Sequence, residues 1–525
     1  MTKIEDKRPV RSSLDLRLGI TGARRLRADQ LDRIRTQLHD VLALTKQEME
    51  RLSEEAAVAE SYARTADGRV QLRLRMISPL ARGADRLAAR TALDLGYALC
   101  VPMPFGQAEY EKDFKGREDP EEALLTPEED LAEFREQLAS ASTRFALDGD
   151  RDRKAAPDRD GLAGLAYEAV GRFVVRHCDV LIAVWDGRQS NGRGGTADIV
   201  HYAATVGVPV WWIHAVDEKT GPAWLAGIQD LRDPALPSEH PEESLRAHLQ
   251  RLIPPPPRVH PHDHGWIGPL GALFRKKNVS LAPAYFAEKP LPSRARWKTY
   301  SKVMTWASQV DPPWTPACRP DEPMARYWFD LFEPADARAG ELAARYRSTY
   351  VLVIILATLA LIFGAVALAF ADKDYERLSL AMALLELLTL VLIVVLVADS
   401  FRSEWHERSI EYRLLAELFR TQRTLALLGW ALSIGNVQLL ADTERWSWVA
   451  WLFASAQRAA PLAEREFADN EADRTILQAF IEEQLIYHRR RERMARNAAL
   501  KLEKIGGWVF AVVLLCVFSK VLTEG

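Results

Sequence analysis

The sequence predicts an α/β domain with a doubly wound parallel sheet, joined to an all-α region that carries two to three transmembrane helices. Two observations lead to this division. Between Leu14 and Ala215, short apolar runs alternate with helical patterns, as in chains whose strands and helices alternate around a parallel sheet. Further along, Val351–Phe370 and Leu378–Val397 are apolar over about 20 residues each, the length at which a helix crosses a bilayer.

The N-terminal part contains five runs with the character of buried parallel strands, which are nearly continuous in Val, Ile and Leu, as in DVLIAVW. The predicted strands are Leu14–Gly22, Arg73–Ser78, Ala98–Pro104, Asp179–Gly187 and Val208–Ala215. The predicted helices between them are Ala28–Glu60, Gly83–Gly96, Pro127–Ser140, Gly161–His177 and Gly194–Gly207. Gln107–Pro127 and Asp148–Asp160 are expected to be charged, irregular insertions.

The remaining segments are assigned by composition. We expect a tail at 1–13, the α/β domain at 14–215, a Pro/Trp-rich connector at 216–344 whose short helices could pack on the α/β domain, a transmembrane hairpin at 345–401, a helical region at 402–505 and a third apolar helix at 506–525. Within them, Ser403–Leu428 is expected to continue the second span, and Trp430–Ala468 and Ile476–Ile505 are expected to be helical. Gly506–Leu522 is either a short span or a packed, interfacial helix.

Charge and cysteine content exclude several classes of protein. Lys and Arg number 69 against 72 Asp and Glu, so the chain as a whole is not a nucleic-acid binder. The four cysteines form no CxxC pair, which argues against a disulfide framework or a zinc knuckle. The first residues lack the apolar core of a secretory signal. We therefore expect a multi-pass membrane protein with its N-terminal domain in the cytoplasm.

Three glycine-containing turns follow predicted strands, at the edge where open α/β sheets bind ligands. They are Gly19–Arg24, Ser78–Asp85 and Gly192–Thr196. Small residues let backbone N–H groups approach a phosphate, and an arginine can pair with its charge. A single loop glycine is usually only a turn residue, but three at successive strand ends favour a nucleotide or phosphorylated-sugar ligand.

The motifs GITGxR, SxLARGADRLAA, PMPF…Y…DF, AYEAVGRFVVRHCDVLIAVWDG and GRGGTAD together resemble the SLOG branch of Rossmann-like proteins, which is related to the LOG nucleotide phosphoribohydrolases and the DprA family. The resemblance covers roughly Leu14–Ala215 and implies a nucleotide-derived ligand over the glycine turns, with Asp186 able to reach a ribose hydroxyl. The ligand-binding positions that it implies are Gly19, Thr21, Gly22, Arg24, Ser78, Arg82, Gly83, Asp85, Tyr110, Glu168, Arg172, Asp186, Gly194, Gly195 and Thr196.

One departure from that family bears on catalysis. LOG enzymes read PGGxGTxxE, and the glutamate takes part in hydrolysis, whereas this chain reads GRGGTADIV with Ile199 at that position. Asp198 is one position away and one methylene shorter, and a general acid or base must lie within hydrogen-bond reach of its proton. We therefore expect binding without turnover and no catalytic residue. The alternatives are a membrane-tethered nucleotide phosphoribohydrolase of LOG type and a membrane-anchored scaffold without a ligand.

The C-terminal half resembles the SLATT class of two-span effector domains, mainly through YRSTYVLVIILATLALIFG and WHERSIEYRLLAELFR. Such domains are often joined to nucleotide sensors in bacterial conflict systems. The resemblance implies a sensor-effector in anti-phage defence that binds a second messenger made by a partner enzyme, of cyclic ADP-ribose type or a cyclic oligonucleotide. Binding would drive homo-oligomerisation and disruption of the bacterial inner membrane, in which the resemblance places the protein. No cofactor and no nucleic-acid partner are expected.

Three further features have two interpretations each. Glu386 lies within the second span, where it is either a pore-facing or interhelical acid or a protonated glutamate in a helix interface. His260, His262 and His264 could ligate a metal, although an exposed loop is favoured because no second ligand cluster accompanies them. The basic run His488–Lys504 precedes an apolar segment, which favours lipid over nucleic acid.

Overall fold

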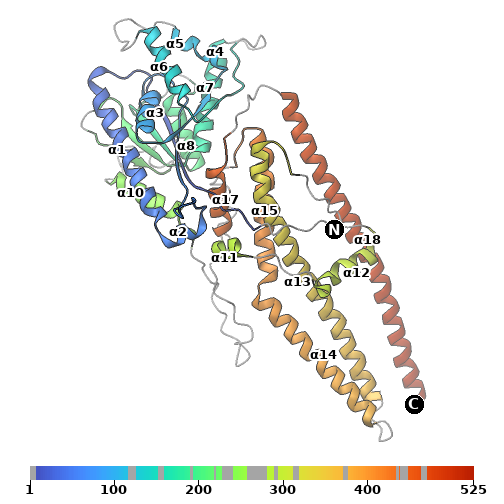
Figure 1. The fold of residues 1–525 in the computed structure, drawn as a ribbon. Coiled ribbons are helices and arrows are strands. Elements are labelled where there is room, and N and C mark those ends of the chain that lie inside the picture. The colour runs from blue at the N-terminus through green and yellow to red at the C-terminus, as the bar shows by residue number, and fades with distance from the viewer. Residues whose placement is uncertain are drawn as a thin grey trace.

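The computed structural model describes residues 8–115, 126–151, 159–189, 193–217, 220–227, 240–256, 281–288, 294–310, 319–369, 376–432, 437, 447–462 and 470–524. They form an α/β head (8–256) and a long helical stem (281–524), as Figure 1 shows. The α/β class of the N-terminal part and the helical class of the C-terminal part are thereby confirmed.

A seven-stranded sheet with the order β4-β3-β2-β1-β5-β6-β7 organises the head. Neighbouring strands are parallel except β7, which pairs antiparallel with β6 at the edge. All five predicted strands are present, and β4 and β7 are additional. The strands are β1 Leu14–Gly22, β2 Leu72–Ile77, β3 Ala98–Met103, β4 Thr143–Ala146, β5 Val180–Trp185, β6 Val210–His214 and β7 Ala223–Leu225.

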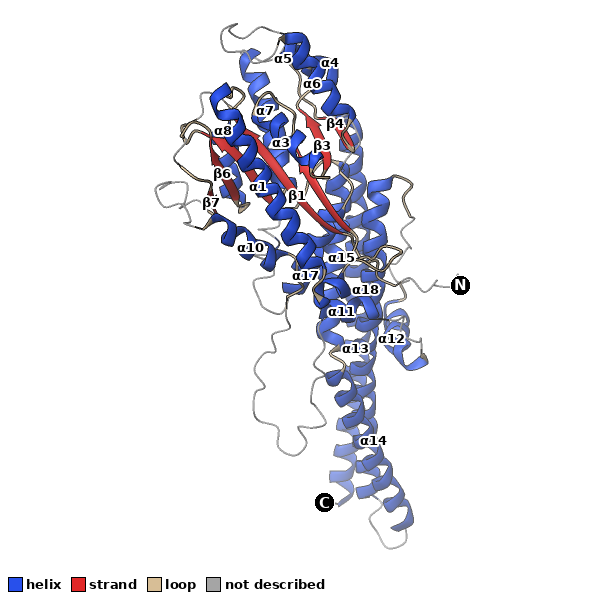
Figure 2. Ribbon diagram, turned by 60° about the vertical axis from the view of Figure 1, so that its left-hand side comes forward, coloured by secondary structure: helices blue, strands red, loops and turns tan. Residues whose placement is uncertain are grey.

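Helices cover both faces of this sheet (Figure 2). Right-handed crossovers put the helices between β1 and β4 on one face and those between β4 and β6 on the other. The contacts agree, since α1 packs on α3, α3 on α6, and α7 on α8. The head helices are α1 Ala28–Ser53, α2 Ala56–Ser61, α3 Ala84–Asp94, α4 Gln107–Tyr110, α5 Lys112–Lys115, α6 Pro127–Ala139, α7 Arg159–His177, α8 Thr196–Val206 and α10 Pro241–Leu252.

The structure corrects several predicted boundaries in the head. The helix expected over Ala28–Glu60 is divided into α1 and α2, and the insertion expected to be irregular at Gln107–Pro127 begins with α4 and α5. The segment expected to be a connector at 216–344 contributes to the head, because β7 extends the sheet and α10 packs on α1. The α/β domain therefore extends beyond Ala215.

The stem consists of long helices joined by short ones. These elements are α11 Leu281–Ala287, the 3₁₀ helix η2 Ala295–Lys298, α12 Thr299–Ser308, α13 Pro323–Ala369, α14 Glu376–Arg402, α15 Trp405–Leu427, α17 Ser447–Ala459 and α18 Asn470–Glu524. The helix is interrupted between α14 and α15, where Glu404 has the left-handed φ of 48°. Ser403–Leu428 is therefore not a direct continuation of the second span. Residues 430–432 are not helical, which shortens the helix expected at Trp430–Ala468.

Two stem helices, α13 and α14, are long and apolar enough to cross a membrane. Only 6% and 11% of their most apolar windows are buried, whereas the core helix of a soluble protein would be mostly buried. Large apolar side chains such as Leu361 (75% exposed) and Leu368 (77%) point outward. The third apolar segment is helical as the end of α18, and Trp508 and Phe510 are exposed there. Such surfaces require lipid or a protein partner.

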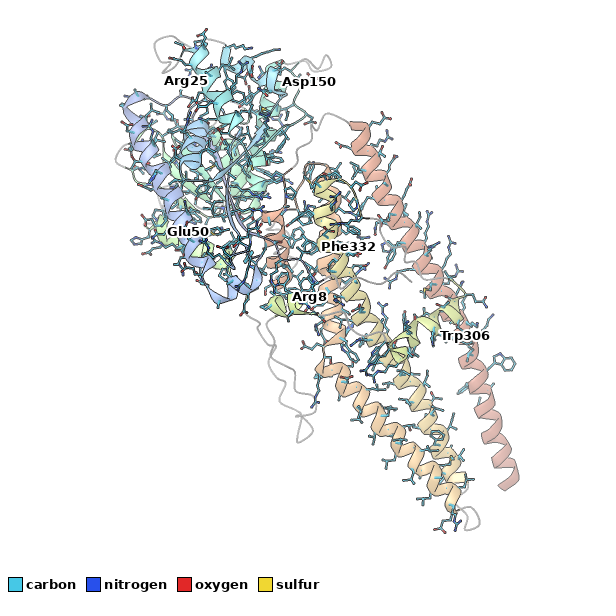
Figure 3. The ribbon with its side chains drawn as sticks, viewed as in Figure 1. Arg8, Arg25, Glu50, Asp150, Trp306 and Phe332 are labelled. Atoms are coloured by element: carbon cyan, nitrogen blue, oxygen red, sulfur yellow. The ribbon has the colours of Figure 1, made fainter. Side chains whose placement is uncertain are left out.

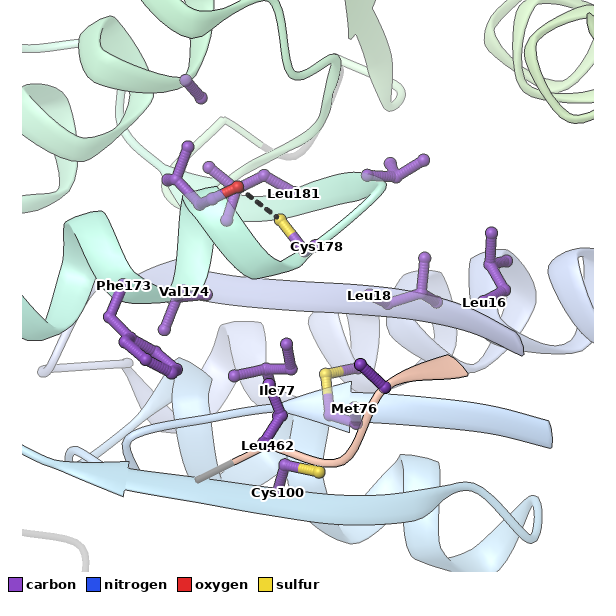
Figure 4. Close-up of a cluster of buried hydrophobic side chains, with 14 of the residues drawn as sticks. Leu16, Leu18, Met76, Ile77, Cys100, Phe173, Val174, Cys178, Leu181 and Leu462 are labelled. Carbon is purple, nitrogen blue, oxygen red and sulfur yellow. Dashed lines mark hydrogen bonds between the residues drawn. The ribbon is translucent and has the colours of Figure 1, made fainter. Parts of the chain in front are cut away.

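Head and stem meet at α17, which packs against β1. Arg17 donates from Nη2 to the carbonyl oxygen of Ala460 at 2.5 Å, and its backbone N–H donates to Asp179 at 2.9 Å. Arg458 of α17 lies 3.7 Å from Asp179, and both side chains are only 2% exposed. Leu462 completes the contact by packing among the apolar residues of β2 and β3 (Figure 4). This buried, charged contact is called the junction below.

Candidate functional site

The glycine turns lie at the carboxyl ends of the strands. Strands β1 to β4 are added toward one edge of the sheet and β5 to β7 toward the other, so the switch point lies between β1 and β5. At such a switch point the loops on either side diverge and leave room for a ligand. The first turn is tied to β5 by a hydrogen bond from Ala23 N–H to the Val184 carbonyl oxygen at 2.9 Å. The second is tied to the first, because Ala84 N–H donates to the Ala23 carbonyl oxygen at 3.1 Å.

Close backbone packing explains two of the glycines without a ligand. Gly83 has φ +77°, and a Cβ there would lie 2.5 Å from the Ala23 carbonyl oxygen. A Cβ on Gly22 would lie 2.5 Å from the Cβ of Ala84. These positions thus hold the first two turns together. Gly19 has a similar role further down β1, since a Cβ there would meet Val174 of α7 at 2.7 Å.

Ser78 also serves the shape of the second turn. It is fully buried; its hydroxyl donates to the Asp85 carbonyl oxygen at 3.1 Å and accepts the Leu80 N–H at 3.2 Å. Leu80 is buried with φ 57°, a left-handed conformation that is costly for a branched side chain and persists only where the surroundings hold it. The β2–α3 turn is therefore a strained, preorganised loop. Thr21, on β1, is partly buried.

Arg24 is the cation that this edge presents. Its side chain is exposed, and its guanidinium lies 4.5 Å from the centroid of the Tyr167 ring of α7. Within the described ranges no carboxylate forms an ion pair with it. Stacking on the ring orients the guanidinium and leaves its N–H groups for an anion. Arg82 differs, because its Nε donates to Asp130 of α6 at 2.5 Å.

The buried side chains of Asp85 and Tyr110 have shifted pKa values because they lie in low-dielectric surroundings. Burial raises the pKa of Asp85 to about 7, against the opposing effects of the Ala81 backbone N–H and of Arg24. Burial also raises the pKa of Tyr110 well above its ordinary value, and the negative charge of Asp85 adds to this. Arg24, Asp85 and Tyr110 are thus neighbours, and Asp85 and Tyr110 lie beneath the surface.

The structure adds three residues that the sequence did not single out. The hydroxyl of Tyr167 donates to Asp113 of α5, and Arg151 donates to Asp113 and, at 3.1 Å, to the Tyr167 oxygen. The Arg151 guanidinium also lies 4.3 Å from the centroid of the Phe105 ring. This network fixes the ring on which Arg24 rests. Tyr167 stands next to Glu168 in the matched motif, and Asp113 is the acid of the DF pair.

The third turn is held to α7 by charge. Glu168 forms ion pairs with Arg172, one turn further along α7, and with Arg193 of the loop. Gly194 has φ +77°, and a Cβ there would lie 2.5 Å from the Glu168 backbone nitrogen. Glu168 and Arg172 are therefore already paired, and in this structure they position the loop.

At the start of α8, Asp198 forms a hydrogen bond to the third glycine turn. Gly195 is the N-cap residue and Thr196 the first helical residue, while the Gly194 N–H donates to Asp198 Oδ2 at 3.1 Å. One carboxylate oxygen of Asp198 is thus committed to the loop. Asp186, at the end of β5, accepts the Arg188 N–H at 3.0 Å and is partly exposed. Its second oxygen lies 3.9 Å from the Arg188 side chain.

Across the described ranges no group of three His, Cys, Asp or Glu residues could hold a metal ion, and His260, His262 and His264 lie outside those ranges. A cavity of about 30 Å³ lies at the junction, lined by Arg17, His177 and Gln457 among others. That volume admits one or two waters and is far too small for a nucleotide.

Glu386 of α14 faces the other helix of the hairpin. A Cβ on Gly364 of α13 would lie 2.9 Å from both carboxylate oxygens of Glu386, so the glycine makes room for the acid. This geometry places Glu386 in the interface between α13 and α14, where an interhelical acid and a protonated glutamate would both lie.

No family model, curated protein sequence or solved structure matches the chain.

Proposed function

We propose that this protein is a membrane-bound sensor-effector whose head binds a nucleotide-derived second messenger. One observation carries the proposal: Arg24, at the β1/β5 switch point, has no carboxylate partner in the described ranges and is oriented by Tyr167. An exposed guanidinium beside the N-terminus of α3 presents donors suited to a phosphate. A cyclic ADP-ribose-type molecule ranks slightly above a cyclic oligonucleotide, following the SLOG resemblance.

The junction offers a physical route from ligand to stem. In this proposal the ligand binds one arrangement of head and stem more tightly than another, and so shifts the population between them. α17 contacts β1, α15 contacts α17, and α13 contacts α15, so a displacement of the sheet reaches the apolar hairpin through three packed interfaces. The assembled state would be a homo-oligomer in the inner membrane, with the head cytoplasmic, that disrupts the bilayer in anti-phage defence.

A second candidate, hydrolysis of a nucleotide N-glycosidic bond, is favoured by Asp85. A buried carboxyl whose pKa is about 7 can act as a general acid or base near neutral pH. Against hydrolysis, one carboxylate oxygen of Asp198 already accepts a hydrogen bond from the Gly194 N–H of the neighbouring loop. The two functions differ in their products, because an enzyme of LOG type releases ribose phosphate and a sensor leaves its ligand intact.

The test uses full-length protein reconstituted in liposomes loaded with a self-quenching dye. Candidate cyclic ADP-ribose-type molecules, cyclic oligonucleotides and nucleoside monophosphates are added, and dye release and free ribose phosphate are measured together. We expect one cyclic ligand to release dye without being consumed. The Arg24→Ala variant should not respond, whereas Arg27→Ala, which removes an exposed arginine paired with Asp29, should respond normally. Rapid release of ribose phosphate would instead identify the hydrolase.

A further inference from the structure

A short helical segment is fixed to α13 just before its apolar run. The Ser348 hydroxyl donates to the Trp297 carbonyl oxygen at 2.8 Å and accepts the Tyr300 N–H at 3.2 Å. Ser348 is fully buried, so these bonds are shielded from water. Two residues later Tyr350 is 63% exposed, and the apolar run begins at Val351. η2 and α12 therefore lie where the polar part of α13 ends.

The second apolar helix ends at the same level. The rings of Trp297 in η2 and Trp405 at the start of α15 have centroids 5.0 Å apart. Arg345 lies over both rings, 5.4 Å and 5.9 Å from their centroids. Trp405 follows the end of α14 at Arg402, so the boundary of this helix is aligned with that of α13.

α18 reaches this level from the other side of α12, as the position of Trp306 in Figure 3 shows. Lys501 Nζ donates to the Trp306 carbonyl oxygen at 2.9 Å and lies 4.2 Å from the centroid of its ring. Asn497 donates to the Ser308 carbonyl oxygen at 3.2 Å. The third apolar segment begins soon after Lys501. Three apolar segments thus change to polar sequence along one plane, and α12 links two of them.

Cations gather on η2, α12 and the adjoining turn of α13. This set is called the cationic collar, and it consists of Arg294, Arg296, Lys298, Lys302 and Arg347, all exposed. Arg296 lies 4.1 Å from the centroid of the Trp297 ring, and Arg347 lies 5.4 Å from that of Tyr300. Burial lowers the pKa of the neighbouring Arg345, and the positive charges of Arg294 and Arg296 lower it further, while Glu341 and Asp399 oppose this effect. Like charges are therefore crowded together here.

We infer that the cationic collar binds the phosphate groups of anionic phospholipids at the membrane surface. The inference rests on the proposed membrane location of the stem. Crowded cations at the polar end of apolar helices are complementary to a negatively charged lipid surface. Trp306, 55% exposed on the same segment, is an aromatic anchor of the kind found at that depth. The collar thus fixes how deep the hairpin sits, and it is separate from the Arg24 site on the head.

The experiment uses the full chain purified in a neutral detergent. Thermal unfolding is followed after addition of phosphatidylglycerol, phosphatidylcholine or soluble glycerol phosphate at equal concentration. We expect phosphatidylglycerol to raise the Tm by several degrees more than phosphatidylcholine, glycerol phosphate to have little effect, and the increment to shrink with salt. The collar variant carries Arg294→Gln, Arg296→Gln, Lys298→Gln and Lys302→Gln. The control carries four substitutions on the head, Arg27→Gln, Arg35→Gln, Arg69→Gln and Arg188→Gln.

The collar variant should unfold like the native protein in phosphatidylcholine and lose most of the phosphatidylglycerol increment, whereas the control should keep it. Equal effects of the two lipids on the native protein, or a full increment in the collar variant, would overturn the inference. An equal effect of glycerol phosphate would overturn it in favour of a soluble anion. A phosphatidylglycerol effect without any nucleotide response would leave the collar standing and count against the proposed sensor.

Discussion

Asp85 makes the stability of the head depend on pH. Burial raises its pKa from the ordinary 3.8 to about 7, a difference worth about 4 kcal/mol between the two protonation states. Because the folded protein holds this proton to a higher pH than the unfolded chain does, the contribution of Asp85 to stability is complete below pH 3.8. It is lost progressively as the pH rises to about 7.

The perturbation is Asp85→Asn, which keeps the shape of the side chain and removes its titration. Between pH 5 and pH 7.5 the free energy of unfolding of the head should fall by about 2.5 kcal/mol in the native protein relative to this variant. Hydrogen exchange of full-length protein, followed by mass spectrometry on peptides from β2 and α3, gives that free energy once intrinsic rates are corrected for pH. Asp32→Asn is the control, because that carboxylate is 93% exposed.

A difference between Asp85→Asn and the native protein that does not change with pH would refute this reasoning. It would mean that the carboxyl remains ionised in the folded protein, with Arg24 and the Ala81 N–H outweighing burial.

Three further predictions concern packing. Gly83→Ala should lower the free energy of unfolding by about 3 kcal/mol, because a Cβ there combines a left-handed φ with a backbone clash. Gly96 has φ +83° but no atom within 4 Å of the added Cβ, so Gly96→Ala should cost only about 1 kcal/mol. Equal losses in denaturant titrations would show that the turns are not closely packed. Arg458→Met should cost about 3 kcal/mol, because the buried Asp179 loses its ion-pair partner and keeps, among the described residues, only the hydrogen bond from the Arg17 N–H. Adding Asp179→Asn should restore part of the loss, and a double variant less stable than the single one would contradict this. Gly364→Leu should separate the apolar helices and lower the Tm of the detergent-solubilised protein, and an unchanged Tm would argue against the close contact at that position.

The central strands and the apolar helices could be predicted because their sequences are distinctive over several residues. β5 is apolar at every position, and the runs in α13 and α14 are each about 20 residues long. β4 and β7 could not be predicted in the same way, since Thr143–Ala146 and Ala223–Leu225 are too short to show a period. They owe their conformation to a neighbouring strand that is already in place.

At the candidate site, the sequence located the turns but not the state of each side chain. Arg24 and Arg82 are both arginines beside a glycine turn. Among the residues that the structure describes, Arg82 has a carboxylate partner, Asp130 from 48 residues away, and Arg24 has none. The contact between Arg24 and Tyr167 depends on the packing of α7 next to β1, which no local pattern shows. The junction was missed for the same reason, because a buried arginine such as Arg458 looks like a solvent-exposed one until its surroundings are known.

Direct measurement of ligand binding tests the central claim most closely. Full-length protein in detergent is titrated calorimetrically with cyclic ADP-ribose-type molecules and with cyclic oligonucleotides, alongside the Arg24→Ala and Arg27→Ala variants. We expect saturable binding of one of these ligands to the native protein and to Arg27→Ala, and a loss of at least tenfold in affinity for Arg24→Ala, which corresponds to about 1.4 kcal/mol. Binding that is unaffected by Arg24→Ala, or no binding of any of these ligands, would contradict it.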